Sequence, residues 1–131
     1  MRSPPQVHRI IETDREKPAA PHSWAIQANG TLYSVHVPIR QDGSIESGDA
    51  TRQTEVTLAD LESTLQAAGG TLSNVVLVQI FLTSLEHKPA VDEVYTRFFD
   101  EPYPVRACVA VSELPTPDTV IEMVVTAIIP K

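Results

Sequence analysis

Two apolar runs near the end of the sequence have the alternation of β-strands, and each carries one charge. The first run is Pro104–Val111, which contains Arg106, and the second is Val120–Val125, which contains Glu122. Because successive side chains of a strand point to opposite faces of a sheet, Arg106 shares its face with Cys108 and not with the valines around it. A charge inside such an apolar strand needs a structural or functional reason, because burying it unpaired is costly.

A proline-rich segment, 114–118, separates the two runs and predicts a turn that pairs them as a β-hairpin. In one register of this hairpin, Glu122 lies diagonal to Cys108 on the neighbouring strand. We therefore expect Arg106, Cys108 and Glu122 to line one pocket.

The preceding sequence predicts the other elements of the fold. The apolar residues of 23–39 are interrupted by Asn29-Gly30, a dipeptide typical of a two-residue hairpin turn. The helical spacing of leucines predicts a helix over 50–68, which Gly69-Gly70 ends. The nearly continuous β-branched run over 75–82 is typical of a central strand, and Pro89 suits the first turn of a helix that ends before Pro102.

The resulting order is β-β-α-β-α-β-β, with two helices that each need a sheet face to cover their apolar side. We predict one α+β domain over 1–131, in which two helices pack on one mixed sheet. Residues 1–21 contain four prolines and several charges, and they predict an irregular N-terminal arm with one short strand over 7–12.

Composition excludes several classes of protein. The chain has one cysteine among 131 residues, so it forms no internal disulfide, and no Cys/His cluster has the spacing of a zinc site. We therefore expect no metal and no cofactor. The net charge of −7 argues against nucleic-acid binding. Without a signal peptide or a run of about 20 apolar residues, we expect a cytoplasmic protein that does not associate with membranes.

Several motifs in the predicted order resemble the YjgF/RidA family of reactive-imine deaminases. The most specific is Pro104-Val105-Arg106-Ala107-Cys108, followed by Leu114-Pro115 and Ile121-Glu122-Met123. Supporting pieces are Leu32-Tyr33-Ser34 before Pro38, the helix end Ala67-Ala68-Gly69-Gly70, and Val91-Asp92-Glu93-Val94-Tyr95 before Phe98-Phe99. The resemblance covers the chain from about Trp24 to Ile129.

This resemblance implies a chorismate-mutase-like fold of the bacillus type and a homotrimer with ligand clefts between subunits. It implies hydrolysis of 2-imino or enamine acids to 2-keto acids and ammonia, in the detoxification of reactive metabolites. Arg106 would clamp the substrate carboxylate, because a guanidinium matches a carboxylate in two parallel hydrogen bonds. Glu122 would orient the attacking water and carry a proton. The structural alternative is an ion pair between Arg106 and Glu122.

Five other positions are candidates for the same pocket, each with an ordinary structural role as its alternative. Ser34 matches a family serine at a strand end, and Cys108 would form pocket wall and not act as a nucleophile. Three positions depart from the family pattern: Val35 replaces a usual glycine, Trp24 lies where a tyrosine is usual, and Asp92 replaces an asparagine. A negative charge at Asp92 would disfavour an anionic ligand, although the Val35 amide would still be able to donate to one.

Two other functions remain open from the sequence. The chain would also suit a noncatalytic trimer that binds a small carboxylate or regulates a partner, which Val35 and Asp92 favour. A ribonuclease or inhibitor of translation is the third, and the acidic charge with no acid–base pair of histidines argues against it. His36, two residues after Ser34, would share its face and add a group that titrates near neutral pH.

Overall fold

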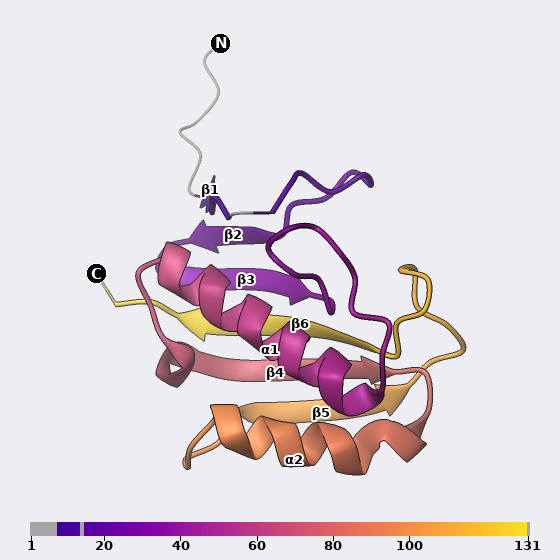
Figure 1. The fold of residues 1–131 in the computed structure, drawn as a ribbon. Coiled ribbons are helices and arrows are strands. Elements are labelled where there is room, and N and C mark those ends of the chain that lie inside the picture. The colour runs from indigo at the N-terminus through magenta and orange to yellow at the C-terminus, as the bar shows by residue number, and fades with distance from the viewer. Residues whose placement is uncertain (1–7, 14, 131) are drawn as a thin grey trace.

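The computed structural model describes residues 8–13 and 15–130, and the elements of this part follow the predicted order (Figure 1). The strands are β1 (His8–Ile10), β2 (Ala25–Ala28), β3 (Thr31–His36), β4 (Val75–Leu82), β5 (Val105–Ala110) and β6 (Ile121–Ile128). The helices are α1 (Ala50–Ala67) and α2 (Lys88–Phe98). Two short 3₁₀ helices lie between these elements: η1 (Leu72–Asn74) precedes β4, and η2 (Leu85–His87) precedes α2. The short strand expected in the arm is β1, and Val7, which we included in it, lies outside the described residues.

Local sequence signals account for the turns and helix ends. Asn29 and Gly30 have φ values of 51° and 81°, the left-handed conformation that a tight hairpin turn between β2 and β3 requires. The side chain of Asp49 accepts a hydrogen bond from the Arg52 amide at 2.9 Å and caps the start of α1. Gly69 follows α1 at φ 84°, where a residue with a Cβ atom would be strained. The predicted turn at Asn29-Gly30 and the predicted helix end at Gly69-Gly70 are therefore confirmed.

The strand order is β1-β2-β3-β6-β4-β5, which differs from the sequence prediction in one important respect. β6 pairs antiparallel with both β3 and β4, while β5 pairs parallel with β4 at the edge of the sheet. β5 and β6 are therefore separated by β4, and the predicted hairpin between them is wrong. The connection that contains α2 carries the chain from β4 to its parallel neighbour β5, as a parallel pair requires.

The two helices cover one face of the sheet and leave the other open (Figure 1). Side chains of β3, β4 and β6 that point toward the helices, such as Leu32, Ile80 and Met123, are fully or almost fully buried. On the open face, Tyr33 and Val105 remain 53% and 71% exposed. No helix of the described residues is long and apolar enough to cross a membrane.

Candidate functional site

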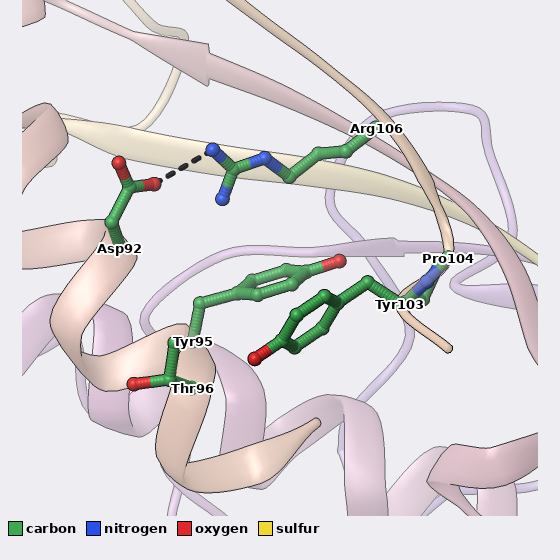
Figure 2. Close-up of a pocket in the computed structure, with 6 residues that line it drawn as sticks. All are labelled: Asp92, Tyr95, Thr96, Tyr103, Pro104 and Arg106. Atoms are coloured by element: carbon green, nitrogen blue, oxygen red, sulfur yellow. Dashed lines mark ion pairs between the residues drawn. The ribbon is translucent and has the colours of Figure 1, made fainter. Parts of the chain in front are cut away.

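A pocket of about 320 Å³ lies beside α2 and the start of β5, and Arg106 reaches into it (Figure 2). The lining residues are Asp92, Tyr95, Thr96, Tyr103, Pro104 and Arg106. Arg106 stands opposite the buried Val78 in the β4–β5 pair, so its side chain belongs to the helix-covered face. Because β5 is at the edge of the sheet, the guanidinium can turn toward α2 and stay partly accessible.

Asp92 holds the guanidinium of Arg106. Its Oδ1 atom lies 2.7 Å from Nη2 of Arg106, and its Oδ2 atom accepts a hydrogen bond from Nζ of Lys88, also at 2.7 Å. Burial alone would raise the pKa of Asp92, but the hydrogen bonds and charges of Lys88 and Arg106 outweigh it and lower that pKa. Asp92 is therefore ionised at neutral pH. The structural alternative for Arg106, an ion pair with Glu122, is wrong within the chain, because the partner of the guanidinium is Asp92.

The remaining walls of the pocket are largely aromatic. The guanidinium of Arg106 lies 4.9 Å from the centre of the Tyr95 ring, which is a cation–π contact. The centres of the Tyr95 and Tyr103 rings are 6.5 Å apart (Figure 2). Burial raises the pKa of Tyr95 to about 12, against the charge of Arg106, so the phenol stays protonated. The pocket can thus hold an anion at one end and apolar atoms at the other.

Cys108 lies on the same face as Arg106 and packs partly against the core. Burial raises the pKa of its thiol, although the positive charges of Arg106 and Lys88 act in the opposite direction. Since a thiolate is the reactive form, a raised pKa agrees with the interpretation of Cys108 as wall and not nucleophile.

Glu122 lies on the other face of the sheet from Arg106. It stands opposite Phe81 of β4, which in turn pairs with Val109 of β5, and all three point away from the helices. The prediction that Arg106, Cys108 and Glu122 line one pocket of a single chain is therefore wrong. Burial raises the pKa of Glu122, and the charge of His22 opposes this effect, so the carboxyl group is suited to proton transfer closer to neutral pH.

Two more of the candidate positions, Val35 and Trp24, lie outside the Arg106 pocket. Val35 pairs with Val124 of β6 on the open face. Its backbone amide, which we expected to be free for a ligand, donates to the carbonyl oxygen of Trp24 at 3.0 Å. Trp24 precedes β2, and its indole Nε1 donates to the Glu16 carbonyl at 2.9 Å. Neither residue contributes to the Arg106 pocket.

Ser34 is part of a buried polar network under α1. Its Oγ lies 2.7 Å from Nε2 of His36, and Nδ1 of that ring lies 2.7 Å from Oδ2 of Asp60 on α1. Since a carboxylate only accepts, Nδ1 of the neutral ring donates to Asp60 and Nε2 accepts from the serine hydroxyl. Arg15 completes the network with an ion pair to Oδ2 of Asp60 at 3.1 Å and a hydrogen bond to Thr64 at 3.2 Å. Ser34 is buried and its hydroxyl pairs with the His36 ring, so its position in this chain is internal and differs from the structural alternative for this serine, a backbone cap at a strand end.

The buried imidazole of His36 predicts a loss of stability in mild acid. Burial lowers its pKa, and the charge of Arg15 does the same, while the hydrogen bond and charge of Asp60 oppose them. The unfolded chain therefore binds a proton below about pH 6.5 that the folded chain does not. We expect the free energy of unfolding to fall by up to about 1.4 kcal/mol per pH unit from there down to the lowered pKa.

Urea unfolding between pH 8 and pH 5 measures this effect, and the His36→Gln variant is the comparison. Glutamine has no proton to gain in this range, so its pH dependence should lack the His36 contribution. Equal slopes for both proteins would show that His36 is not the responsible group.

Sequence reasoning missed most of the residues that surround Arg106 and Ser34. Tyr95 was named only within a supporting motif of the family resemblance, although its position three residues after Asp92 places both on one helical face. Arg15 and Asp60 carry no local signal, because they meet His36 only through the tertiary fold. In residues 8–13 and 15–130, no three side chains of His, Cys, Asp or Glu gather as metal ligands would.

Comparison with known proteins places this geometry in context. The family model described as endoribonuclease L-PSP matches residues 12–129. The chain is 39% identical over 108 residues to the protein mmf1, mitochondrial, of Schizosaccharomyces pombe, which covers 80% of this chain and 65% of that protein. This chain thus spans just under two thirds of the yeast protein's length.

Two further relatives match over most of both chains. The 2-iminobutanoate/2-iminopropanoate deaminase of Dermatophagoides farinae is 31% identical over 111 residues, which are 82% of this chain and 86% of that one. The crystal structure of YyfA from Yersinia pestis, described as a protein of unknown function of the conserved Rid family, has a TM-score of 0.86 and 32% identity. That similarity covers 93% of this chain and 99% of YyfA.

Proposed function

The chain belongs to the YjgF/RidA family, and on that premise we propose that it hydrolyses 2-imino acids and their enamine tautomers to 2-keto acids and ammonia. The relative from Dermatophagoides farinae that is named as a 2-iminobutanoate/2-iminopropanoate deaminase supports this choice of reaction. The observation that carries the proposal is Arg106, a partly exposed guanidinium at the end of a pocket of about 320 Å³. Such a group binds the carboxylate that all these substrates share.

The active form is a homotrimer with a cleft between neighbouring subunits, as the family resemblance implies. Arg106 and Glu122 point to opposite faces of the sheet, so one chain cannot bring both groups to one small substrate. The open face supports assembly, because Val105 and Val109 on edge strand β5 are 71% and 47% exposed. Edge strand β5 of one subunit against the open face of the next would place Arg106 near Glu122 of the neighbouring subunit.

The reaction requires little from the protein beyond orientation and one proton transfer. Arg106 binds the carboxylate, and Glu122 accepts a proton from a water molecule as its oxygen attacks the imine carbon. The imine nitrogen takes up a proton, and the resulting carbinolamine collapses with cleavage of the C–N bond to a keto acid and ammonia. The raised pKa of Glu122, caused by burial, makes that carboxyl a better proton acceptor and donor near neutral pH.

The test is the decay of 2-iminopropanoate or 2-iminobutanoate, generated in place by an amino-acid oxidase and trapped with semicarbazide. Wild-type protein should lower the amount of trapped imine in proportion to its concentration. Decay at the rate of the protein-free sample would contradict the proposed activity.

The Arg106–Asp92 ion pair favours one alternative, a noncatalytic protein that binds a small carboxylate and acts through that contact. Asp92 already occupies part of the guanidinium, and its negative charge repels an anion. In that case 2-oxobutanoate would raise the melting temperature of the protein through Arg106, while imine decay stays at background. The same two assays therefore separate the two functions.

The ion pair also predicts that the Asp92→Asn variant binds carboxylates more tightly. The substitution removes the competing charge but keeps the shape of the side chain, so we expect the Kd for 2-oxobutanoate to fall by about tenfold, or about 1.4 kcal/mol. Calorimetric titration measures the Kd. Glu93→Gln is the matched control, because Glu93 lies next in sequence on α2, is exposed and pairs with Arg97. An unchanged Kd in Asp92→Asn would show that Asp92 does not compete with the ligand.

A further inference from the structure

The pocket beside α2 is larger than the smallest substrates of the proposed reaction require. Its volume is about 320 Å³, whereas 2-iminopropanoate carries only a methyl group besides its imine and its carboxylate. Pockets of about 300–1,000 Å³ are the size that encloses a drug-sized ligand. With the carboxylate bound at Arg106, much of the pocket is left for the side chain of a substrate, and the walls of that part decide which side chain fits.

Most polar groups around this space are already engaged or shielded. Both carboxylate oxygens of Asp92 are taken, Oδ1 by Arg106 and Oδ2 by Lys88. The hydroxyl of Thr96 is used within α2, where it donates to a backbone carbonyl at 2.8 Å. The hydroxyl oxygen of Tyr95 is buried and has no hydrogen-bond partner among the described residues. A charged or strongly polar substrate side chain would therefore lose its hydration here and find few groups to replace it.

Two tyrosine rings form the apolar part of the wall. Tyr95 is 4% exposed and packs on Phe99 with ring centres 4.5 Å apart, so the core fixes its position. Tyr103 is 48% exposed, and its ring centre lies 6.5 Å from that of Tyr95. Aromatic rings attract one another in offset or edge-on arrangements at centre separations of about 4.5–7 Å. Tyr103 therefore offers an accessible ring surface to a ligand, next to a wall that does not move.

The guanidinium of Arg106 directs a bound acid toward these rings. Asp92 pairs with one terminal nitrogen, Nη2, and Figure 2 shows the other terminal nitrogen on the side of the tyrosines. The carboxylate and the side chain of a 2-imino acid are attached to the same carbon atom. A carboxylate bound at the second nitrogen thus places the side chain of the substrate beside Tyr95 and Tyr103.

We propose that Tyr95 and Tyr103 form a subsite for the substrate side chain, and that the protein prefers 2-imino acids with an aromatic side chain to those with a methyl or ethyl group. Tyr103 determines this specificity, because it is the more accessible of the two rings. The inference rests on the proposed function, in which Arg106 binds the carboxylate of a 2-imino acid.

Calorimetric titration with two keto acids, 2-oxo-3-phenylpropanoate and 2-oxobutanoate, tests the preference without turnover. The phenyl compound should have a Kd at least about tenfold lower, because its ring leaves water for the surface of the tyrosines. Tyr103→Ala should bring the ratio of the two Kd values close to one, whereas Tyr103→Phe, which keeps the ring, should preserve it. Leu85→Ala is the matched control: it removes an apolar side chain that is 52% exposed and lies outside the pocket, so the ratio should not change.

Equal Kd values for the two keto acids, or no binding of either, would overturn the inference. A preference that survives in Tyr103→Ala would overturn it too, because the phenyl ring would then bind elsewhere. In the imine-trapping assay, kcat/KM for 2-imino-3-phenylpropanoate should exceed that for 2-iminobutanoate by about tenfold. Equal values would contradict the inference and leave the proposed reaction in place, whereas a blank assay beside an intact Kd preference would contradict the proposed function alone.

Discussion

Replacing Arg106 with alanine is expected to reduce the acceleration of imine hydrolysis by about a hundredfold or more, because the substrate loses the group that orients its carboxylate. Arg106→Lys should recover little, since an ammonium lacks the planar fork that binds both carboxylate oxygens. The semicarbazide-trapping assay measures the loss. Arg97→Ala is the control: Arg97 is a half-exposed arginine of α2 that pairs with Glu55 and lies outside the pocket.

The same substitution tests whether the site is shared between subunits. Arg106→Ala and Glu122→Gln should each be nearly inactive alone. If each site takes Arg106 from one subunit and Glu122 from the next, an equal mixture refolded together should recover about a quarter of wild-type activity, because one interface in four then carries both groups. A mixture as inactive as its components would show that both groups act within one chain, or that one of them is not needed.

Replacing Asp60 with alanine is expected to cost about 3–5 kcal/mol of the free energy of unfolding, the largest stability effect that the structure predicts. The carboxylate of Asp60 accepts a hydrogen bond from His36 and forms an ion pair with Arg15. Its loss would leave the Arg15 guanidinium buried without a counterion. Urea unfolding at fixed protein concentration measures the change. Glu62→Ala, at an exposed position of the same helix, should stay within about 0.5 kcal/mol of wild type.

A double variant separates the lost charge from the lost packing. Adding Arg15→Met to Asp60→Ala removes the uncompensated cation, so it should restore part of the lost stability. A double variant less stable than Asp60→Ala alone would show that Arg15 stabilises the fold by packing on Trp24 and not through the ion pair.

Much of the fold could be predicted because its signals are local. The Asn29-Gly30 turn, the leucine spacing of 50–68 and the continuous apolar run of 75–82 each depend on neighbouring residues, and each specified its element. The pairing of the last two strands could not be predicted in this way. A turn of five residues suggested a hairpin, yet β6 forms its hydrogen bonds with β3 and β4, and in that central position every second side chain from Ile121 to Ala127 is buried.

In the candidate site, the sequence likewise identified individual residues but not the contacts that depend on the tertiary fold. Arg106 and Asp92 were both singled out from the sequence, and the structure brings them to 2.7 Å of each other. The pairing of their charges was not foreseen, because it depends on how α2 lies against β5. Ser34 was expected to face a ligand, but its hydroxyl contacts His36, and the sequence had placed both on one strand face without showing that α1 covers it.

The position of β6 also bears on how the protein is made. The strand that follows all the others in the sequence lies between β3 and β4, so the sheet has two unpaired inner edges until residues 121–128 have left the ribosome. During synthesis the earlier strands and both helices exist without the partner that joins them. A chain that ends before residue 121 would therefore lack the hydrogen bonds that join β3 to β4, and it would present those two unpaired strand edges to other chains.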